Sequence, residues 1–279
     1  MAHLLAIDLG TSSVKVALVH ADTLTVSASA SAEYPIYTPM RGYAEQDPAE
    51  WWKAVITATQ TAMAASENTE VIGIGVSGQM HGAVLLDSDL NSVHPAIIWP
   101  DTRASAQVNA LANARNTFDA TLPGPPAAGF AAASFLWLKE NRPDVLAATY
   151  VWCLPKDMIG RYLTGQVHTE PSDAAASWLF DVARGRWAED VVAFCGLSMS
   201  QMPEVVSSHA IIGTLTSSAA AELGIPDGIP VVAGSADLPA QGIGCGVVDS
   251  STVLVTLGTG GQIFVPVASP PPPPDDRYY

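Results

Sequence analysis

Residues 4–19 read LLAIDLGTSSVKVALV, and this stretch decides the fold. An apolar strand ends at Asp8, a turn of small residues follows at Gly10-Thr11-Ser12, and a second apolar strand returns. A carboxylate at a strand end can hold a hydrated cation, and small turn residues leave backbone N–H groups open to phosphate oxygens. The pattern predicts either a hairpin that binds a metal–nucleotide phosphate group or an ordinary hairpin with an aspartate at its rim.

A second stretch repeats this arrangement near the other end of the sequence. Residues 253–265 read VLVTLGTGGQIFV, which is again a strand, a Gly258-Thr259-Gly260 turn and a strand. The repetition favours the phosphate-binding interpretation, because two such turns can contact one phosphate chain from two sides.

The composition indicates a globular protein that does not bind nucleic acid. The chain has 279 residues, of which 48% are hydrophobic and 14% are charged, with a formal net charge of −15. The charged fraction lies below the usual ~25%, which argues against disorder. Lys and Arg form no cluster, so nucleic acid is not an expected partner, and phosphate would be bound by backbone amides and a metal.

The sequence also predicts a cytoplasmic protein. Cys153, Cys195 and Cys245 lie far apart and follow no metal-ligand spacing, so we expect buried free thiols in a reducing compartment. The first residues begin a strand without a signal-peptide pattern, and no apolar run approaches the ~18 residues that cross a bilayer.

Strands and helices alternate along the chain, which predicts an α/β fold with a mixed sheet and helices on both faces. Asp47-Pro48 is a typical helix start, and Trp51-Trp52 reads as an anchor of that helix. The expected strands cover 4–9, 13–19, 24–34, 71–76, 83–87 (beside 71–76), 230–233 and 252–257. The expected helices cover a segment from residue 48 past Met63, then 103–115, 131–141, 155–163 and 237–244.

The last residues suggest a linker. Five consecutive prolines, Pro270 to Pro274, predict a stiff extended segment that normally leads to another domain. We therefore expect one domain over residues 1–268 and a truncated proline-rich linker over 269–279, with a natural tail as the alternative.

Three further segments carry candidate functional residues. Ser77 to Gly82 follow a strand, at the sheet edge where α/β proteins bind ligands, so Gln79, Met80 and His81 can project into a cleft. Asp101 and Arg103 could bracket a polyhydroxylated ligand, or Asp101 could cap the following helix. Asp237, between a strand and a helix, could cap that helix or accept the proton of a substrate hydroxyl.

Together these segments resemble the FGGY family of carbohydrate kinases, and among them the xylulokinases. The matching motifs occur in the order of the family: DLGTSSVK (8–15), EQDP to WW (45–52), GQMHG (78–82), WPDTR (99–103), LPKD (154–157), SDA (172–174) and the Asp237 segment. The GQMHG loop is what favours xylulokinases over relatives of the glycerol kinase type.

The resemblance implies an actin/hexokinase-like ATPase (ribonuclease H-like) fold and the phosphorylation of D-xylulose by ATP at O5. Asp237 would be the base, and Asp8 would position Mg²⁺. Met80, His81, Asp101 and Arg103 would bind the sugar with Asp237. The residues that would face the nucleotide phosphates are Gly10, Thr11, Ser12, Lys15, Gly258, Thr259 and Gly260. Partners would be a small sugar, with no membrane, and we allow for a homodimer.

The sequence departs from the family pattern in three places. Leu238 and Pro239 follow the expected base where xylulokinases carry Asn, so another sugar or polyol, such as ribulose or fuculose, stays open. The segment 129–134 lacks the usual Thr and Lys. Whole members also have a second, nucleotide-binding domain, which is absent here. We therefore expect the sugar-binding N-terminal half, inactive alone, or a non-catalytic sugar-binding domain.

Overall fold

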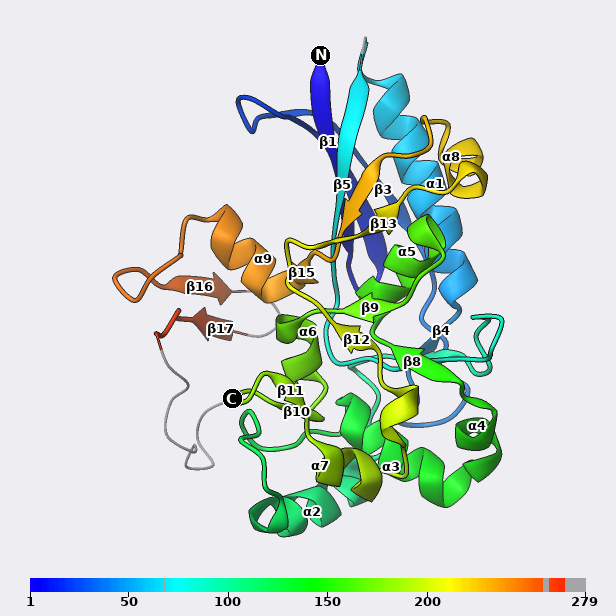
Figure 1. Ribbon diagram of the computed structural model, residues 1–279, viewed down its shortest axis with the longest axis vertical. Coiled ribbons are helices and arrows are strands. Elements are labelled where there is room, and N and C mark those ends of the chain that lie inside the picture. Colours follow the sequence, from blue (N-terminus) through cyan, green and yellow to red (C-terminus); the bar gives the residue numbers. More distant parts are fainter. Residues whose placement is uncertain (68, 258–260, 269–279) are drawn as a thin grey trace.

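The computed structural model describes residues 1–67, 69–257 and 261–268. Within them the main sheet has seven strands in the order β13-β14-β5-β1-β2-β3, with β15 also paired to β5 (Figure 1). β5 is parallel to β1, β14 and β15, whereas β2 is antiparallel to β1 and β3, so the sheet is mixed as predicted. The strands are β1 (Ala2–Leu9), β2 (Ser13–His20), β3 (Val26–Glu33), β5 (Glu70–Gly78), β13 (Ile211–Thr214), β14 (Pro230–Val232) and β15 (Ser235–Ala236).

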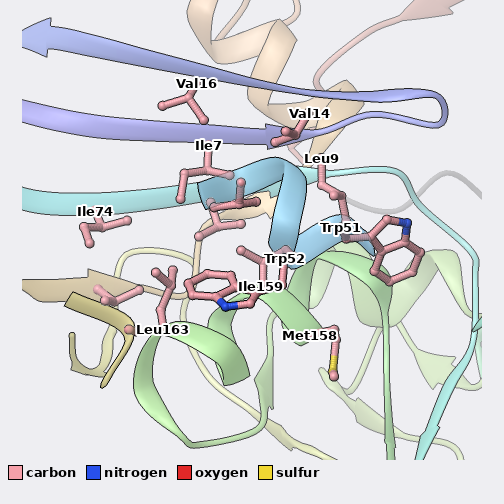
Figure 2. Packing of buried hydrophobic residues seen from close by; sticks show 14 of the residues in the cluster. Ile7, Leu9, Val14, Val16, Trp51, Trp52, Ile74, Met158, Ile159 and Leu163 are labelled. Carbon is pink, nitrogen blue, oxygen red and sulfur yellow. The ribbon is translucent and has the colours of Figure 1, made fainter. Parts of the chain in front are cut away.

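One face of this sheet is covered by helix α1 (Pro48–Ala64). Asp47 caps the helix as predicted, since its carboxylate accepts the N–H of Ala49 at 2.9 Å. Strand residues with period 2 point toward α1, and Ile7 and Val16 lie in the same core as Trp51 (Figure 2). Helices α5 (Pro155–Thr164) and α8 (Ser217–Leu223) complete this layer.

The opposite face carries helix α9 (Asp237–Gly244), which contacts β5 and β15. Ala6 and Ala17 alternate with the core residues of their strands, and Ala240 of α9 lines the same cavity as these two alanines. Helices therefore lie on both faces, as predicted, but in this sheet α9 lies beside β15 and β5 only (Figure 1). Its Ala240 lines the same cavity as Asp8.

Helices α2 (Ser105–Ala114), α3 (Ala131–Asn141), α4 (Pro143–Ala148) and α7 (Glu189–Phe194) lie below the main sheet in Figure 1. They contribute, with α6 (Pro171–Ala176), to a second hydrophobic cluster, which includes Phe135, Trp152 and Trp178. Short 3₁₀ turns cover Arg115–Thr117 and Met199–Gln201. The two-stranded pairs are β4 (Glu45–Gln46) with β7 (Ala96–Ile97), β6 (Val84–Leu86) with β8 (Val151–Cys153), β9 (His168–Thr169) with β12 (Glu204–Val205), β10 (Phe180–Asp181) with β11 (Arg186–Trp187), and β16 (Leu254–Leu257) with β17 (Gly261–Phe264).

One expected strand pairing and one expected thiol burial are wrong. The segment 83–87 is not a neighbour of β5, because β6 pairs with β8, which lies far along the chain. The three cysteines are free, but Cys245 is exposed rather than buried. Within the described ranges no helix combines the length and apolar character that crossing a membrane requires.

Candidate functional site

A row of polar residues crosses the sheet where its parallel strands end. Pairing aligns Ser235 of β15 with Ser77 of β5, Ser77 with Asp8 of β1, and Asp8 with Lys15 of β2. Because cross-strand partners point to the same face, these four side chains share the face that carries α9. They line a cavity of about 830 Å³ on that face.

A smaller cavity of about 400 Å³ brings Asp8 and Asp237 together. Its walls are Asp8, Ser77, Asp237, Leu238, Ala240, Gln241 and Gln262. Gln262 comes from β17, so the second hairpin of the sequence contributes to the same cavity as Asp8 of the first hairpin. The turn residues Gly258, Thr259 and Gly260 lie outside the described residues, and their predicted phosphate contact stays a prediction.

Both carboxyl groups of this cavity hold protons more tightly than usual. Burial raises the pKa of Asp8, and the nearby Lys15 ammonium partly offsets that rise. Burial also raises the pKa of Asp237, which the N–H of Leu238 lowers and the Asp8 charge raises. Asp237 is the first residue of α9 and Ala236 is its N-cap, so the predicted capping role is wrong. A base with a raised pKa is better suited to accept a proton near neutral pH.

In the Gly10-Thr11-Ser12 turn the carbonyl groups accept hydrogen bonds from other parts of the protein. Tyr34 Oη donates to the carbonyl of Gly10 at 2.5 Å, and the Tyr34 N–H donates to that of Ser12 at 3.2 Å. The hydroxyl of Thr11 accepts the indole N–H of Trp99 at 2.8 Å. Within the described residues the N–H groups of Thr11 and Ser12 donate to no acceptor. These two N–H groups are therefore suited to an anion such as phosphate.

His81 has a strained backbone and a fixed ring. Its φ is +73°, which is uncommon for a residue with a side chain. Nδ1 lies 2.7 Å from the carbonyl of Ala176, and the ring stacks on Phe130 at 4.3 Å between centroids. Burial lowers the pKa of His81 to about 4, although the hydrogen bond with Ala176 opposes this. Since a carbonyl only accepts, Nδ1 carries the proton of the neutral ring and Nε2 is an acceptor.

Helix α6 connects the GQMHG loop to Asp237. The carbonyl of Ala176, its last residue, accepts from His81, and the hydroxyl of Ser172 near its start accepts the N–H of Ala236 at 3.0 Å. A six-residue helix is ~9 Å long, so this helix sets the distance between the two segments. Met80, the neighbour of His81, is half-buried.

Asp101 and Arg103 are paired with each other. Arg103 Nη2 lies 2.7 Å from Asp101 Oδ2 and 2.7 Å from Glu45 Oε1, and the Arg103 and Asp101 side chains are 1% and 0% exposed. Helix α2 begins at Ser105 with no side-chain cap, so the predicted capping role of Asp101 is wrong. In the structure both charges are used within the protein, and their predicted contact with sugar stays a prediction.

Sequence reasoning missed the residues that hold the loops in place. Gln46 Nε2 donates to the carbonyl of Thr11 at 2.8 Å, and Gln46 Oε1 accepts from Trp51 and Gln79. Lys156 Nζ donates to the carbonyl of Ala233 at 3.0 Å. Both residues lie in motifs of the resemblance, but only tertiary contacts show which backbone groups they bind.

The mixed sheet and its opening hairpin have the arrangement of the actin/hexokinase-like ATPase fold. The profile described as "FGGY family of carbohydrate kinases, N-terminal domain" matches residues 3–244. The chain belongs to the FGGY family of carbohydrate kinases.

Relatives and solved structures agree with this assignment. The chain is 37% identical to the xylulose kinase of Bacillus subtilis over 94% of this chain and 53% of that protein. It is 35% identical to the xylulose kinase of Escherichia coli over 93% of this chain and 53% of that protein. A crystal structure described as a "xyloylose kinase" from Brucella ovis superposes with a TM-score of 0.89 at 35% identity, covering 94% of this chain and 54% of that one.

A more distant structure shows the fold alone. Plasmodium falciparum glycerol kinase with ADP superposes with a TM-score of 0.87 at 22% identity, over 95% of this chain and 54% of that one. The chain spans about half the length of the curated relatives it matches.

Proposed function

We propose that this chain forms the sugar-binding half of an ATP-dependent kinase that converts D-xylulose to D-xylulose 5-phosphate. The observation that carries the proposal is Asp237, whose carboxyl group lies with Asp8 on one cavity and has a raised pKa. The relatives named xylulose kinase, which are 33–37% identical over 94% of the chain, support the choice of sugar.

In this mechanism Asp237 accepts the proton of the O5 hydroxyl as that oxygen attacks the γ-phosphorus of ATP, and the bond from this phosphorus to the oxygen that bridges it to the β-phosphate breaks and releases ADP. His81 Nε2 accepts a hydrogen bond from another sugar hydroxyl, and Met80 lines the same pocket. The N–H groups of Thr11 and Ser12 bind phosphate oxygens, with Gly10 and Lys15 beside them. Phosphoryl transfer needs mainly positioning and charge neutralisation, which these groups can supply.

The carboxylates fit a magnesium ion that is carried in by the nucleotide. Within the described part of the chain, no group of three or more His, Cys, Asp or Glu residues could hold a metal ion. Mg²⁺ bound to ATP needs only one or two carboxylates, because phosphates and water complete its shell. Asp8 would be that carboxylate, and the ion would neutralise phosphate charge.

The test is a coupled kinase assay with D-xylulose and ATP, on this chain and on the full product of its gene. We expect turnover by the full product and little or none by this chain alone. Strong turnover by this chain would overturn its assignment as an inactive half. Failure of the full product on every ketose would overturn the kinase proposal.

A second candidate function is a kinase for another sugar, such as ribulose, fuculose or a polyol. Leu238 favours it, because this apolar side chain lines the cavity beside Asp237. A panel of sugars assayed with the full product decides between the two, and a clear preference for one of them over D-xylulose would select this alternative.

A further inference from the structure

A cluster of buried charges lies under the segment that leads to Asp237. Lys156 and its partners Asp157 and Asp173 have side chains that are 2%, 0% and 0% exposed. Lys156 Nζ lies 2.6 Å from Asp157 Oδ1 and 3.6 Å from Asp173 Oδ2. Burying such charges costs more than an apolar core of the same volume, so the cluster is weak support for stability and suggests another role.

The Lys156 ammonium contacts the chain just before Asp237. Its Nζ donates to the carbonyl of Ala233 at 3.0 Å, and Ala233 is followed by Gly234, which has φ +77°. The chain turns at Gly234 and reaches Asp237 three residues later. Lys156 therefore holds the entrance of this turn.

A third buried carboxyl group, that of Glu170, supports the exit of the same turn. Glu170 Oε1 accepts the hydroxyl of Ser172 at 2.6 Å, and that hydroxyl accepts the N–H of Ala236 at 3.0 Å. Glu170 Oε2 also accepts the hydroxyl of Ser208 at 2.8 Å, while the Ser208 carbonyl accepts the Gly234 N–H at 2.9 Å. The segment is thus fixed on both sides by hydrogen bonds with side chains outside the cavity that Asp8 and Asp237 share.

The charge states agree with this arrangement. Burial alone would lower the pKa of Lys156, but Asp157, Asp173 and Glu170 raise it above its usual value, so the ammonium stays charged. Burial raises the pKa of Asp173 well above its usual value, and the charge of Asp237 adds to that rise. The Lys156 ammonium therefore remains able to donate to the carbonyl of Ala233.

We propose that Lys156 and Ser172 are positioning residues for Asp237, which they aim by holding the carbonyl of Ala233 and the N–H of Ala236. The proposal rests on the proposed role of Asp237 as base. Neither residue needs to touch the sugar, since a displacement of about 1 Å at a reacting group can cost ~10²-fold in rate.

The experiment separates positioning from stability with three variants. Lys156→Met leaves Asp157 buried and unpaired, whereas Lys156→Met/Asp157→Asn removes both charges at no change in net charge. Leu111→Ala, in α2 of the second cluster, is the control for simple destabilisation. The readouts are the thermal midpoint and the NMR titration of the Asp237 carboxyl in this chain, and kcat and KM for D-xylulose in the full gene product.

We expect Lys156→Met to lower the thermal midpoint and the double variant to restore most of it. In the double variant we expect a displaced Asp237 titration, kcat reduced by about 10²-fold and KM within about 3-fold of the parent value. Leu111→Ala should lose thermal stability and keep both the titration and kcat.

The proposal is overturned if the double variant titrates and turns over like the parent chain. Ser172→Ala is a second test of the proposal, and it does not require the double variant to fold. It removes no charge and should shift the titration in the same way, and an unchanged titration would refute the role of Ser172. Because the titration needs no turnover, it decides the positioning role even if the gene product phosphorylates no sugar.

Discussion

Gln79 Nε2 donates a hydrogen bond to Gln46 Oε1 at 3.0 Å, and both residues are 1% exposed. Gln46 also binds the carbonyl of Thr11 through its other amide atom, at 2.8 Å. One buried amide thus joins the Gly10-Thr11-Ser12 turn to the loop that carries Met80 and His81. The two proposed subsites are held in one relative position before any ligand binds.

Replacing this amide should destabilise the fold. Gln46→Leu leaves the buried N–H donors of Trp51 and Gln79 without their acceptor, so we expect a loss of about 2 kcal/mol or more in the free energy of unfolding. Urea denaturation measures it. The control is Gln60→Ala, which removes an exposed hydrogen bond from the Gln60 amide to the carbonyl of Glu222. It should change the free energy of unfolding by less than about 0.5 kcal/mol. Equal losses in the two variants would contradict a structural role for Gln46.

Asp237→Asn should abolish proton acceptance while keeping the shape of the side chain. In the full gene product we expect kcat for D-xylulose to fall by about 10²–10⁴-fold, the usual contribution of a general base. The affinity of this chain for D-xylulose, measured by calorimetry, should stay within a few-fold. Asp249→Asn, an exposed aspartate, is the matched control and should keep its turnover. A variant Asp237→Asn that still phosphorylates the sugar rules Asp237 out as the base.

The sequence predicts those elements whose pattern is complete within a short segment. The hairpin 4–19, the helix 131–141 and the helix 237–244 all occur within a residue or two of the expected positions, because period-2 and helical patterns are local. The Asp47 cap is likewise local. The pairing of β6 with β8 was not predictable, since their strands are more than sixty residues apart.

The same limit explains what was missed in the site. Asp8 could be selected because it lies at the end of a strand, and His81 and Asp237 because each comes shortly after one. The burial of Asp101 and Arg103 could not be predicted, because Arg103 also pairs with Glu45, which lies in β4 far from both in the sequence. Lys156 acts on a carbonyl 77 residues further along the chain, and such a contact has no local signature.

His81 should make the affinity for sugar depend on pH in the acid range and not near neutral pH. Its pKa of about 4 keeps the ring neutral above pH ~5, with Nε2 as an acceptor. Affinity for D-xylulose should therefore be flat from pH 8 to pH ~5.5 as far as His81 is concerned, and should fall as pH approaches 4, where Nε2 gains a proton. His81→Asn tolerates the positive φ and should bind about tenfold more weakly at neutral pH. An inflection near pH 6.5 in the parent chain would contradict the burial of the ring.

The ionisation of Asp173 should lower the free energy of unfolding of this chain as the pH rises. Its pKa is raised by burial, so the folded state keeps a proton that the unfolded state releases above about pH 4. The stability contributed by this proton is complete below that pH and declines as pH rises toward the pKa of the folded state. Asp173→Asn cannot ionise, so it should be more stable than the parent by ~1 kcal/mol at pH 7, with the gain disappearing near pH 3. Thermal denaturation at several pH values tests this, and a variant that is less stable at pH 7 would show that the ionised form is favoured.

Gly234 and Gly224 form a matched pair for testing how tightly the Asp237 segment is packed. Both have positive φ, +77° and +73°, so alanine costs each about 1 kcal/mol or more in backbone strain. A Cβ on Gly234 would also lie 1.7 Å from the carbonyl oxygen of Val76, whereas nothing lies within 4 Å of a Cβ on Gly224. We expect Gly224→Ala to lose about 1 kcal/mol and Gly234→Ala about 3 kcal/mol or more in the free energy of unfolding.

The contact of a Cβ at Gly234 with Val76 can be relieved only if the segment moves away from β5, which would displace Asp237 from Asp8. Gly234→Ala should therefore also displace the Asp237 titration, and Gly224→Ala should not. Similar losses and unchanged titrations in both variants would mean that this segment is not fixed against β5.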